Sequence, residues 1–136
     1  MQPHTRSELF EFETEDALAR FGDSDLSALQ LLAEYNESEY NDLYVKDSIV
    51  EDLGGTDAYD RQRDLVADFL RLDLLERNAY CDIVPRAGRV ELLVAQASDL
   101  VFIRTFRGDD ALFISVERNG SIDEFIEIVE ALVGDE

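Results

Sequence analysis

The residues that could carry out nucleophilic or metal chemistry are few. The chain has one histidine, His4, and one cysteine, Cys81. A Ser-His-Asp or Cys-His site needs a histidine that reaches the nucleophile, and His4 lies in an N-terminal stretch, residues 1–6, that we expect to be loose. Asp82 follows Cys81, and its negative charge disfavours a reactive thiolate, so we interpret Cys81 as a small buried residue. We therefore predict no catalytic residue, no metal and no cofactor.

Two further patterns imitate ligand sites. Four side chains have the spacing of calcium ligands at positions one, three, five and twelve of an EF-hand loop: Asp23, Asp25, Ser27 and Glu34. That loop needs a glycine at its sixth position, where this chain has Ala28. Gly54-Gly55 lacks both the lysine and the spacing of a phosphate-binding loop. We interpret these two glycines as a break in the chain, after which a capped helix begins. Neither pattern supports a binding site.

Tyrosine and arginine side chains offer the remaining candidate chemistry, which is recognition of another protein. Both residue types are enriched at protein interfaces. Three tyrosines cluster around a predicted hairpin in the first half of the chain, and three arginines lie near the last predicted hairpin. Tyrosines that are half-buried in strands with wet hydroxyl groups are the alternative. The candidate interface residues are Tyr35, Tyr40, Tyr44, Arg104, Arg107 and Arg118.

The elements that must position these residues are clearest after residue 89. Short runs rich in β-branched and aromatic residues, separated by turn residues, predict three consecutive antiparallel strands at 89–96, 100–107 and 111–117. Both faces of these strands carry apolar residues, so we expect both faces to be covered. A helix follows, because Ser121 and Glu124 have capping-box spacing and apolar residues recur every three or four positions around Phe125.

The first half of the chain is harder to interpret. A short helix is predicted at 14–21, and residues 40–47 are strand-like. Residues 26–35 have high helix propensity, although alternate residues also fit one face of a strand. A long helix, which Thr56 would cap, is predicted from Thr56 to about Arg77. We expect its buried side to consist of Ala58, Leu65, Val66, Phe69, Leu72 and Leu75.

Two segments resemble a known family. Residues 40–47 read Tyr-Asn-Asp-Leu-Tyr-Val-Lys-Asp, and residues 112–127 contain a last strand followed by a helix with a phenylalanine. Both are similar to an uncharacterised family of small haloarchaeal domains, although that family usually has arginine where this chain has Lys46. The resemblance implies the order strand, strand, helix, three strands, helix. For that reason we expect residues 26–35 to form a strand of a hairpin. The family has no assigned activity, so it implies no catalytic residues.

These elements predict one α+β domain over residues 1–136. Its order is helix, strand, strand, helix, strand, strand, strand, helix, and its antiparallel sheet of five strands has helices on both faces. This is the layout of the roadblock and profilin-like folds. An analogy of fold does not identify a function.

The charge of the chain limits its environment and its partners. The formal net charge is -20 over 136 residues, and Lys46 is the only lysine among twelve basic residues. Dispersed carboxylates of this density are typical of a high-salt cytoplasm, where ions screen the repulsion between them; an ordinary acidic protein is the alternative. The charge argues against nucleic-acid partners and anionic membranes. No apolar run is long enough to span a membrane, and no signal peptide is recognisable.

These observations favour a non-enzymatic function in the cytoplasm of a halophilic archaeon. We expect a protein-interaction or assembly domain. An antiparallel sheet has two edges that invite pairing, so a homodimer is the expected assembly, and any other protein partner is undefined. The alternative is a small-ligand-sensing or regulatory module with a pocket between the sheet and a helix.

Overall fold

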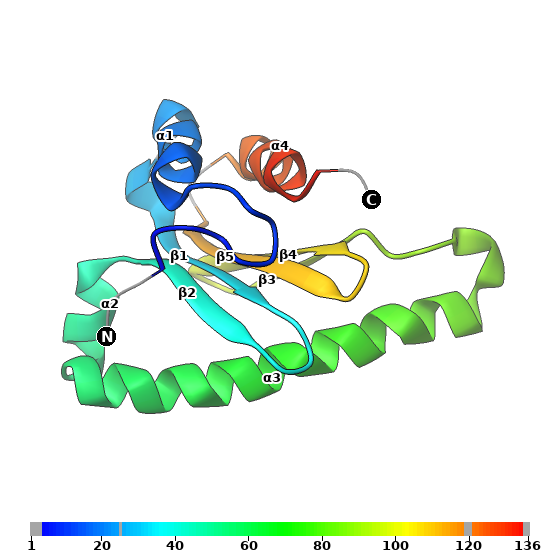
Figure 1. Cartoon of the computed structure of the whole chain (residues 1–136), viewed down its shortest axis with the longest axis horizontal. Helices are drawn as coiled ribbons and strands as arrows, with labels where there is room; N and C mark the ends of the chain where they lie inside the picture. The colour runs from blue at the N-terminus through cyan, green and yellow to red at the C-terminus, as the bar shows by residue number, and fades with distance from the viewer. Residues whose placement is uncertain (1–3, 25, 119–120, 135–136) are drawn as a thin grey trace.

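The computed structural model describes residues 4–24, 26–118 and 121–134, and within these ranges it confirms the α+β fold (Figure 1). The helices are α1 (Thr14–Ser24), α2 (Asp47–Leu53), α3 (Thr56–Ile83) and α4 (Ile122–Val133). The strands are β1 (Leu29–Tyr35), β2 (Tyr40–Val45), β3 (Leu92–Gln96), β4 (Leu100–Arg107) and β5 (Asp110–Glu117). Short 3-10 turns occupy Leu26–Ala28 and Pro85–Ala87.

The strands form one antiparallel sheet in the order β2-β1-β5-β4-β3. The hairpin β1–β2 confirms that most of the ambiguous stretch is a strand rather than a helix. The side chain of Asn36 closes its turn, because Oδ1 accepts hydrogen bonds from the backbone N–H groups of Ser38 (2.9 Å) and Glu39 (2.8 Å). At the β4–β5 hairpin, whose turn lies at the same end of the sheet, Gly108 supplies the positive φ of 61° that the tight turn requires. β2 and β3 are the two edge strands.

Helices α1 and α4 lie on one face of the sheet, and α3 runs across the other (Figure 1). The larger core forms under α1 and α4, where the rings of Phe21 and Phe125 are fully buried with centroids 6.0 Å apart. The smaller core forms under α3, where Leu70 and Leu74 pack against Phe106 and other residues of the sheet. The prediction of helices on both faces is therefore confirmed.

Several boundaries differ from the sequence predictions. α3 continues to Ile83 rather than Arg77, and its last turns extend past the edge of the sheet (Figure 1). β3 begins only at Leu92, so residues 89–91 lead into the strand instead of forming part of it. Thr56 is the first residue of α3 rather than its cap, and neither α3 nor α4 has a side-chain hydrogen bond at its N-cap. The capping chemistry that the sequence predicted is therefore absent from these two helices.

The N-terminal segment also differs from the prediction, because residues 4–6 are not loose. The backbone N–H of His4 donates to the backbone carbonyl oxygen of Asp42 on edge strand β2 (2.7 Å), and Arg6 forms a β-bridge with Glu13. Residues 1–3 lie outside the described part of the chain. The anchor of this segment is Glu34, which is fully buried and accepts hydrogen bonds from the hydroxyl of Ser7 and the backbone N–H of Glu8 (3.0 Å). A buried carboxylate with several donors is stable inside a protein.

Candidate functional site

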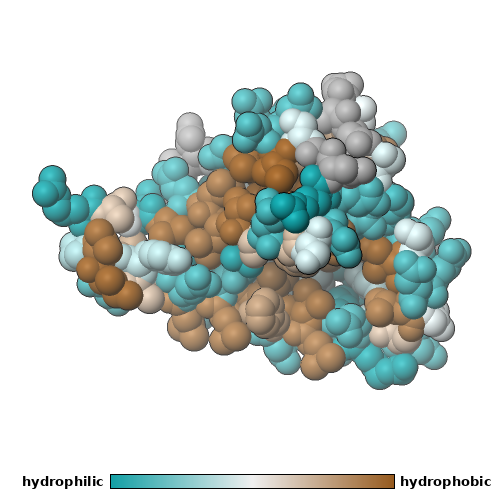
Figure 2. Space-filling model, turned by 180° about the vertical axis from the view of Figure 1, so that it is seen from behind, coloured by the Kyte–Doolittle hydropathy of each residue, from teal (hydrophilic) through white to brown (hydrophobic). Residues whose placement is uncertain are grey.

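The most unusual surface of the molecule is the outer side of α3. Four large apolar side chains there are more than half exposed: Leu65 (65%), Phe69 (63%), Leu72 (55%) and Leu75 (68%). Ile83, which is 77% exposed, continues the row at the end of the helix. We call these five residues the outer stripe. Figure 2 shows apolar side chains gathered along the lower edge of the molecule, where α3 lies.

The outer stripe corrects the prediction of which side of α3 faces the sheet. Of the six residues expected to be buried, Val66 and Ala58 are half-buried and the other four are exposed. The helix instead buries Leu70 and Leu74 together with Tyr59, Ala67 and Asp73. α3 therefore has apolar residues on two sides, and only one of them is covered by this chain. A contiguous exposed apolar surface is typical of a protein interaction site.

A buried polar group explains the orientation of α3. The carboxylate of Asp73 accepts a hydrogen bond from the hydroxyl of Tyr35 (2.9 Å), and Nε of Arg104 lies 3.6 Å from the same oxygen. That distance is an ion pair rather than a hydrogen bond. Burial raises the pKa of Asp73 above its ordinary value, although the charge of Arg104 and the Tyr35 hydroxyl act in the opposite direction. These contacts, made on strands β1 and β4, turn Asp73 toward the sheet.

A second buried carboxylate holds the beginning of α3. The hydroxyl of Tyr59 donates to Asp42 of β2 at 2.9 Å. Burial raises the pKa of Asp42, while hydrogen bonds from Tyr59 and Tyr40 partly offset that rise. Burial and the nearby Asp42 carboxylate also raise the pKa values of both tyrosines. Both tyrosines are therefore neutral donors, and Tyr59, which lies on α3, fixes the helix to β2 of the sheet.

The six residues predicted from the sequence to form an interface do not gather on one surface. Tyr35 is fully buried and Arg104 is 9% exposed, so the structure removes both from any interface of the folded chain. Tyr40 is half-buried against the smaller core and Tyr44 against the larger one. Their aromatic faces are used for packing, in line with the alternative interpretation of these tyrosines. The sequence prediction of this group is wrong for Tyr35 and Arg104.

The remaining two arginines have different surroundings. Arg107 donates to the carbonyl oxygens of Val133 (2.7 Å) and Leu9 (3.2 Å), and its guanidinium lies 4.9 Å from the ring centre of Phe10. It therefore ties the end of α4 to the N-terminal segment. Arg118 is exposed, and it donates to the carbonyl oxygen of Ser98 at 3.5 Å. Of the six predicted residues, Arg118 alone is fully at the surface.

The edge strand β3 is a second uncovered part of the molecule. β3 pairs with β4 alone, so its second edge has no strand partner among the described residues. Its side chains are only partly covered, and Val94 is 45% exposed. Phe102 of β4, which is half-buried, packs with the smaller core under α3. An uncovered edge strand is a second surface suited to pairing with another chain.

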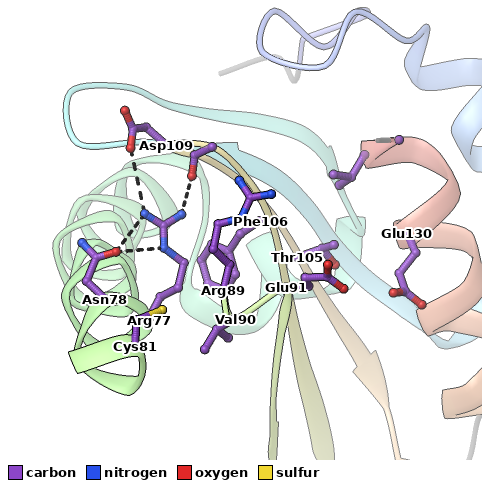
Figure 3. Close-up of a pocket in the computed structure, with 13 residues that line it drawn as sticks. Arg77, Asn78, Cys81, Arg89, Val90, Glu91, Thr105, Phe106, Asp109 and Glu130 are labelled. Atoms are coloured by element: carbon purple, nitrogen blue, oxygen red, sulfur yellow. Dashed lines mark hydrogen bonds and ion pairs between the residues drawn. The ribbon is translucent and has the colours of Figure 1, made fainter. Parts of the chain in front are cut away.

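A cleft of about 500 Å³ lies at the end of the sheet, beside the C-terminal part of α3 (Figure 3). The end of α3 supplies Arg77, Asn78 and Cys81, the lead into β3 supplies residues 89–91, and α4 supplies Glu130. Arg77 donates to the carbonyl oxygen of Gly108, and its guanidinium stacks 5.3 Å from the ring centre of Phe106. The cleft is therefore bounded by both core layers and by four separate segments of the chain, the fourth being the β4–β5 hairpin.

The residues with nucleophilic or metal-binding capacity remain apart. His4 is exposed, with Nε2 3.8 Å from a carboxylate oxygen of Glu8. The thiol of Cys81 donates to the carbonyl oxygen of Gly88 at 2.9 Å. Within residues 4–24, 26–118 and 121–134, no group of three or more His, Cys, Asp or Glu side chains is arranged to hold a metal ion. Over the same ranges, no helix combines the length and the apolar character needed to cross a membrane.

Comparison with known proteins gives no assignment of this surface. No protein-family model matches the chain, and a search of curated proteins finds no similar sequence. The functional argument therefore depends on the geometry of the outer stripe, the β3 edge and the cleft.

Proposed function

We propose that this protein is a non-enzymatic interaction domain that assembles with a second copy of itself through the outer face of α3. The observation that carries the proposal is the outer stripe. Its five large apolar side chains are exposed on a helix whose opposite side already packs on the sheet. Burying such side chains against a partner gives the main favourable free energy of association. A helix that is apolar on two sides fits a position between two packed layers.

The sequence of the outer stripe suits self-association about a two-fold axis. In a two-fold interface the same patch contacts itself, so residue i meets j and j meets i. Phe69 and Leu75 lie three positions before and after Leu72. An antiparallel pairing centred on Leu72 therefore places Phe69 of each copy opposite Leu75 of the other, and Leu72 opposite itself. In the same register, Arg61 of one copy lies opposite Ile83 of the other, next to Asp82.

The size of the stripe defines what else must take part. From Leu65 to Ile83 the helix rises about 27 Å, and a helix is about 10 Å wide, so the contact strip covers roughly 300 Å². A stable interface buries about 800 Å² on each partner. The adjoining β3 edge and the partly exposed face around Phe102 can supply the remaining area. The proposed interface therefore combines α3 with β3.

The environment that fits this assembly is the cytoplasm of a halophilic archaeon. Two copies with a net charge of -20 each repel one another in dilute buffer. The screening length falls from about 10 Å at 0.1 M salt to about 3 Å at 1 M. Molar salt therefore removes most of the repulsion both between copies and within each copy. The dispersed carboxylates and the single Lys46 support this part of the proposal.

The assembly is tested by measuring mass in molar potassium chloride with light scattering. We expect wild type to have twice the monomer mass of 15.5 kDa. The variant Leu72→Gln/Leu75→Gln should have the monomer mass and an unchanged far-ultraviolet circular dichroism spectrum. Leu53→Gln is the matched control, because Leu53 is an exposed leucine (39%) on α2, away from the stripe. A wild-type mass of 15.5 kDa at all concentrations contradicts the proposal.

The high-salt environment is tested separately by thermal melting at matched pH. Stability should rise steeply between dilute buffer and molar potassium chloride, because the unfolded chain spreads the same charges farther apart. The chloride is preferable to the sulfate, since sulfate also strengthens apolar burial. A melting temperature that does not change with salt contradicts the halophilic part of the proposal and leaves the dimer prediction intact.

The cleft at the end of α3 favours a second candidate function, the sensing of a small ligand. Its volume lies within the range of about 300–1,000 Å³ that is usual for ligand sites. Because the cleft is lined by α3 as well as by the sheet, a bound ligand contacts the helix that forms the proposed interface. Ligand binding and assembly are therefore compatible functions of one domain.

A further inference from the structure

The floor of the cleft contains a hydroxyl group without a partner. Thr105 of β4 is 4% exposed and lines the cleft, and its Oγ1 makes no hydrogen bond within the described part of the chain. A buried hydroxyl that lacks a partner costs free energy, and such groups in native proteins usually mark a bound water or ligand. The position of Thr105 therefore points to a donor or acceptor that enters from the cleft.

Two carboxylates lie on the same side of the cleft as Thr105. Figure 3 shows Glu91, beside Thr105, and Glu130, on α4, facing one another. Neither side chain forms an ion pair with another described residue, and both are exposed to solvent. A cationic group between them would be held by two charges and could donate to Oγ1 of Thr105. Charge-assisted hydrogen bonds of this kind are stronger than neutral ones.

The other side of the cleft carries positive charge. The guanidinium groups of Arg77 and Arg89 lie toward α3 and the β4–β5 turn (Figure 3). Arg77 pairs with Asp109 at 3.9 Å, but the side chain of Asp109 is 98% exposed and is free to move into solvent. An anionic group of a ligand can take the place of that carboxylate. The cleft is therefore divided into a negative and a positive end.

From this division we propose that the cleft binds a small zwitterion, with its ammonium group at Thr105, Glu91 and Glu130 and its carboxylate at Arg77 in place of Asp109. A ligand with a single charge occupies one end only and competes there with the ions of a salt solution. A zwitterion is held at both ends, and its net charge of zero avoids the long-range repulsion that an anion meets from a chain with charge -20. The volume of about 500 Å³ accommodates an amino acid or a dipeptide.

Isothermal titration of wild type in molar potassium chloride tests the two-ended site. The probes are glycine, 4-aminobutanoate and 6-aminohexanoate, which place the same two charges at increasing separation. Butanoate and butylammonium are the matched single-charge probes. We expect one zwitterion to bind at least tenfold more tightly than either single-charge probe. Equal affinities for the zwitterion and a single-charge probe overturn the proposal, as does the absence of binding by all three zwitterions.

Two substitutions locate the ammonium end. Thr105→Val removes the hydroxyl without changing the shape, so it should weaken the tightest zwitterion about tenfold. The same change should leave the melting temperature of the unliganded protein equal or higher, because it removes the unpartnered group. Glu130→Gln should also weaken binding about tenfold, while Glu127→Gln, on α4 outside the cleft, should not. Unchanged affinity in both cleft variants places the ligand elsewhere and overturns the proposal.

Discussion

The two faces of the sheet differ in how they use their apolar residues. Under α1 and α4 the core is closed: the rings of Phe21 and Phe125 are fully buried, and the helices expose acidic side chains. Under α3 the core is smaller and includes the buried acids Asp42 and Asp73, while the outer side of the same helix exposes Leu72 and its neighbours. One face completes the fold of a single chain. The other leaves an apolar surface that a second chain can cover.

The largest expected difference between the faces is the response of two phenylalanines to truncation. Phe125→Ala should reduce the free energy of unfolding by about 3–5 kcal/mol, because it leaves a cavity in a fully buried site. Phe69→Ala removes the same atoms from a side chain that is 63% exposed, so it should change monomer stability by less than about 1 kcal/mol. Denaturant titration in molar salt measures both, with Leu72→Gln as a monomeric background. A loss below about 1 kcal/mol for Phe125→Ala contradicts the placement of α4.

A smaller loss is expected when the polar contacts that hold α3 are broken. Arg104→Met leaves Asp73 buried beside Tyr35 without its cation, which should cost about 2–3 kcal/mol. The loss is at the low end for buried pairs, because the raised pKa of Asp73 allows the carboxyl to take up a proton. Adding Asp73→Asn should recover most of the stability, since the amide oxygen still accepts from Tyr35. Additive losses in this double-mutant cycle exclude the ion pair as the anchor of α3.

The sequence predicts the fold of this chain better than its surfaces. β4 and α4 lie where β-branched runs and the apolar spacing around Phe125 place them. These signals are local, because neighbouring residues define the period of each element. The hairpin of β1 could be chosen over a helix only through the family resemblance, since propensity favours the helix. Short-range pattern therefore predicts most of the elements and their order, but it missed α2 and did not by itself decide between helix and strand for β1.

The orientation of α3 could not be predicted from the sequence for a physical reason. Burying Asp73 is favourable only because Tyr35 and Arg104 reach it from strands that are distant in the sequence. The apolar pattern alone puts a charged residue such as Asp73 at the surface. It therefore predicted that the other side of α3, which carries the outer stripe, is buried. The same long-range contact buries Tyr35 and Arg104, so neither can belong to the predicted interface. The signal that remained in the sequence was the presence of apolar residues on two sides of one helix.

The smallest expected effect is on the pH dependence of stability. Burial raises the pKa of Asp42 above its unfolded value. Its contribution to stability is therefore complete below the ordinary pKa of an aspartate and is lost as the pH rises through the raised value. Asp42→Asn should flatten the decline of stability with rising pH in molar salt and change stability by less than about 1 kcal/mol at its maximum. Asp52→Asn, at an exposed position of α2, is the control; equal slopes for the two variants contradict the burial of charge at Asp42.

The central claim, that the outer face of α3 meets a second copy, is tested most directly by cross-linking at Leu72. In a Cys81→Ser background, Leu72→Cys places one thiol on each copy at the proposed two-fold axis, where the two thiols can approach closely enough for a disulfide. Leu53→Cys in the same background is the control. Under mild oxidation in molar potassium chloride, we expect Leu72→Cys to give a covalent species of twice 15.5 kDa much faster than the control does. Equal and slow cross-linking of both variants would contradict the account.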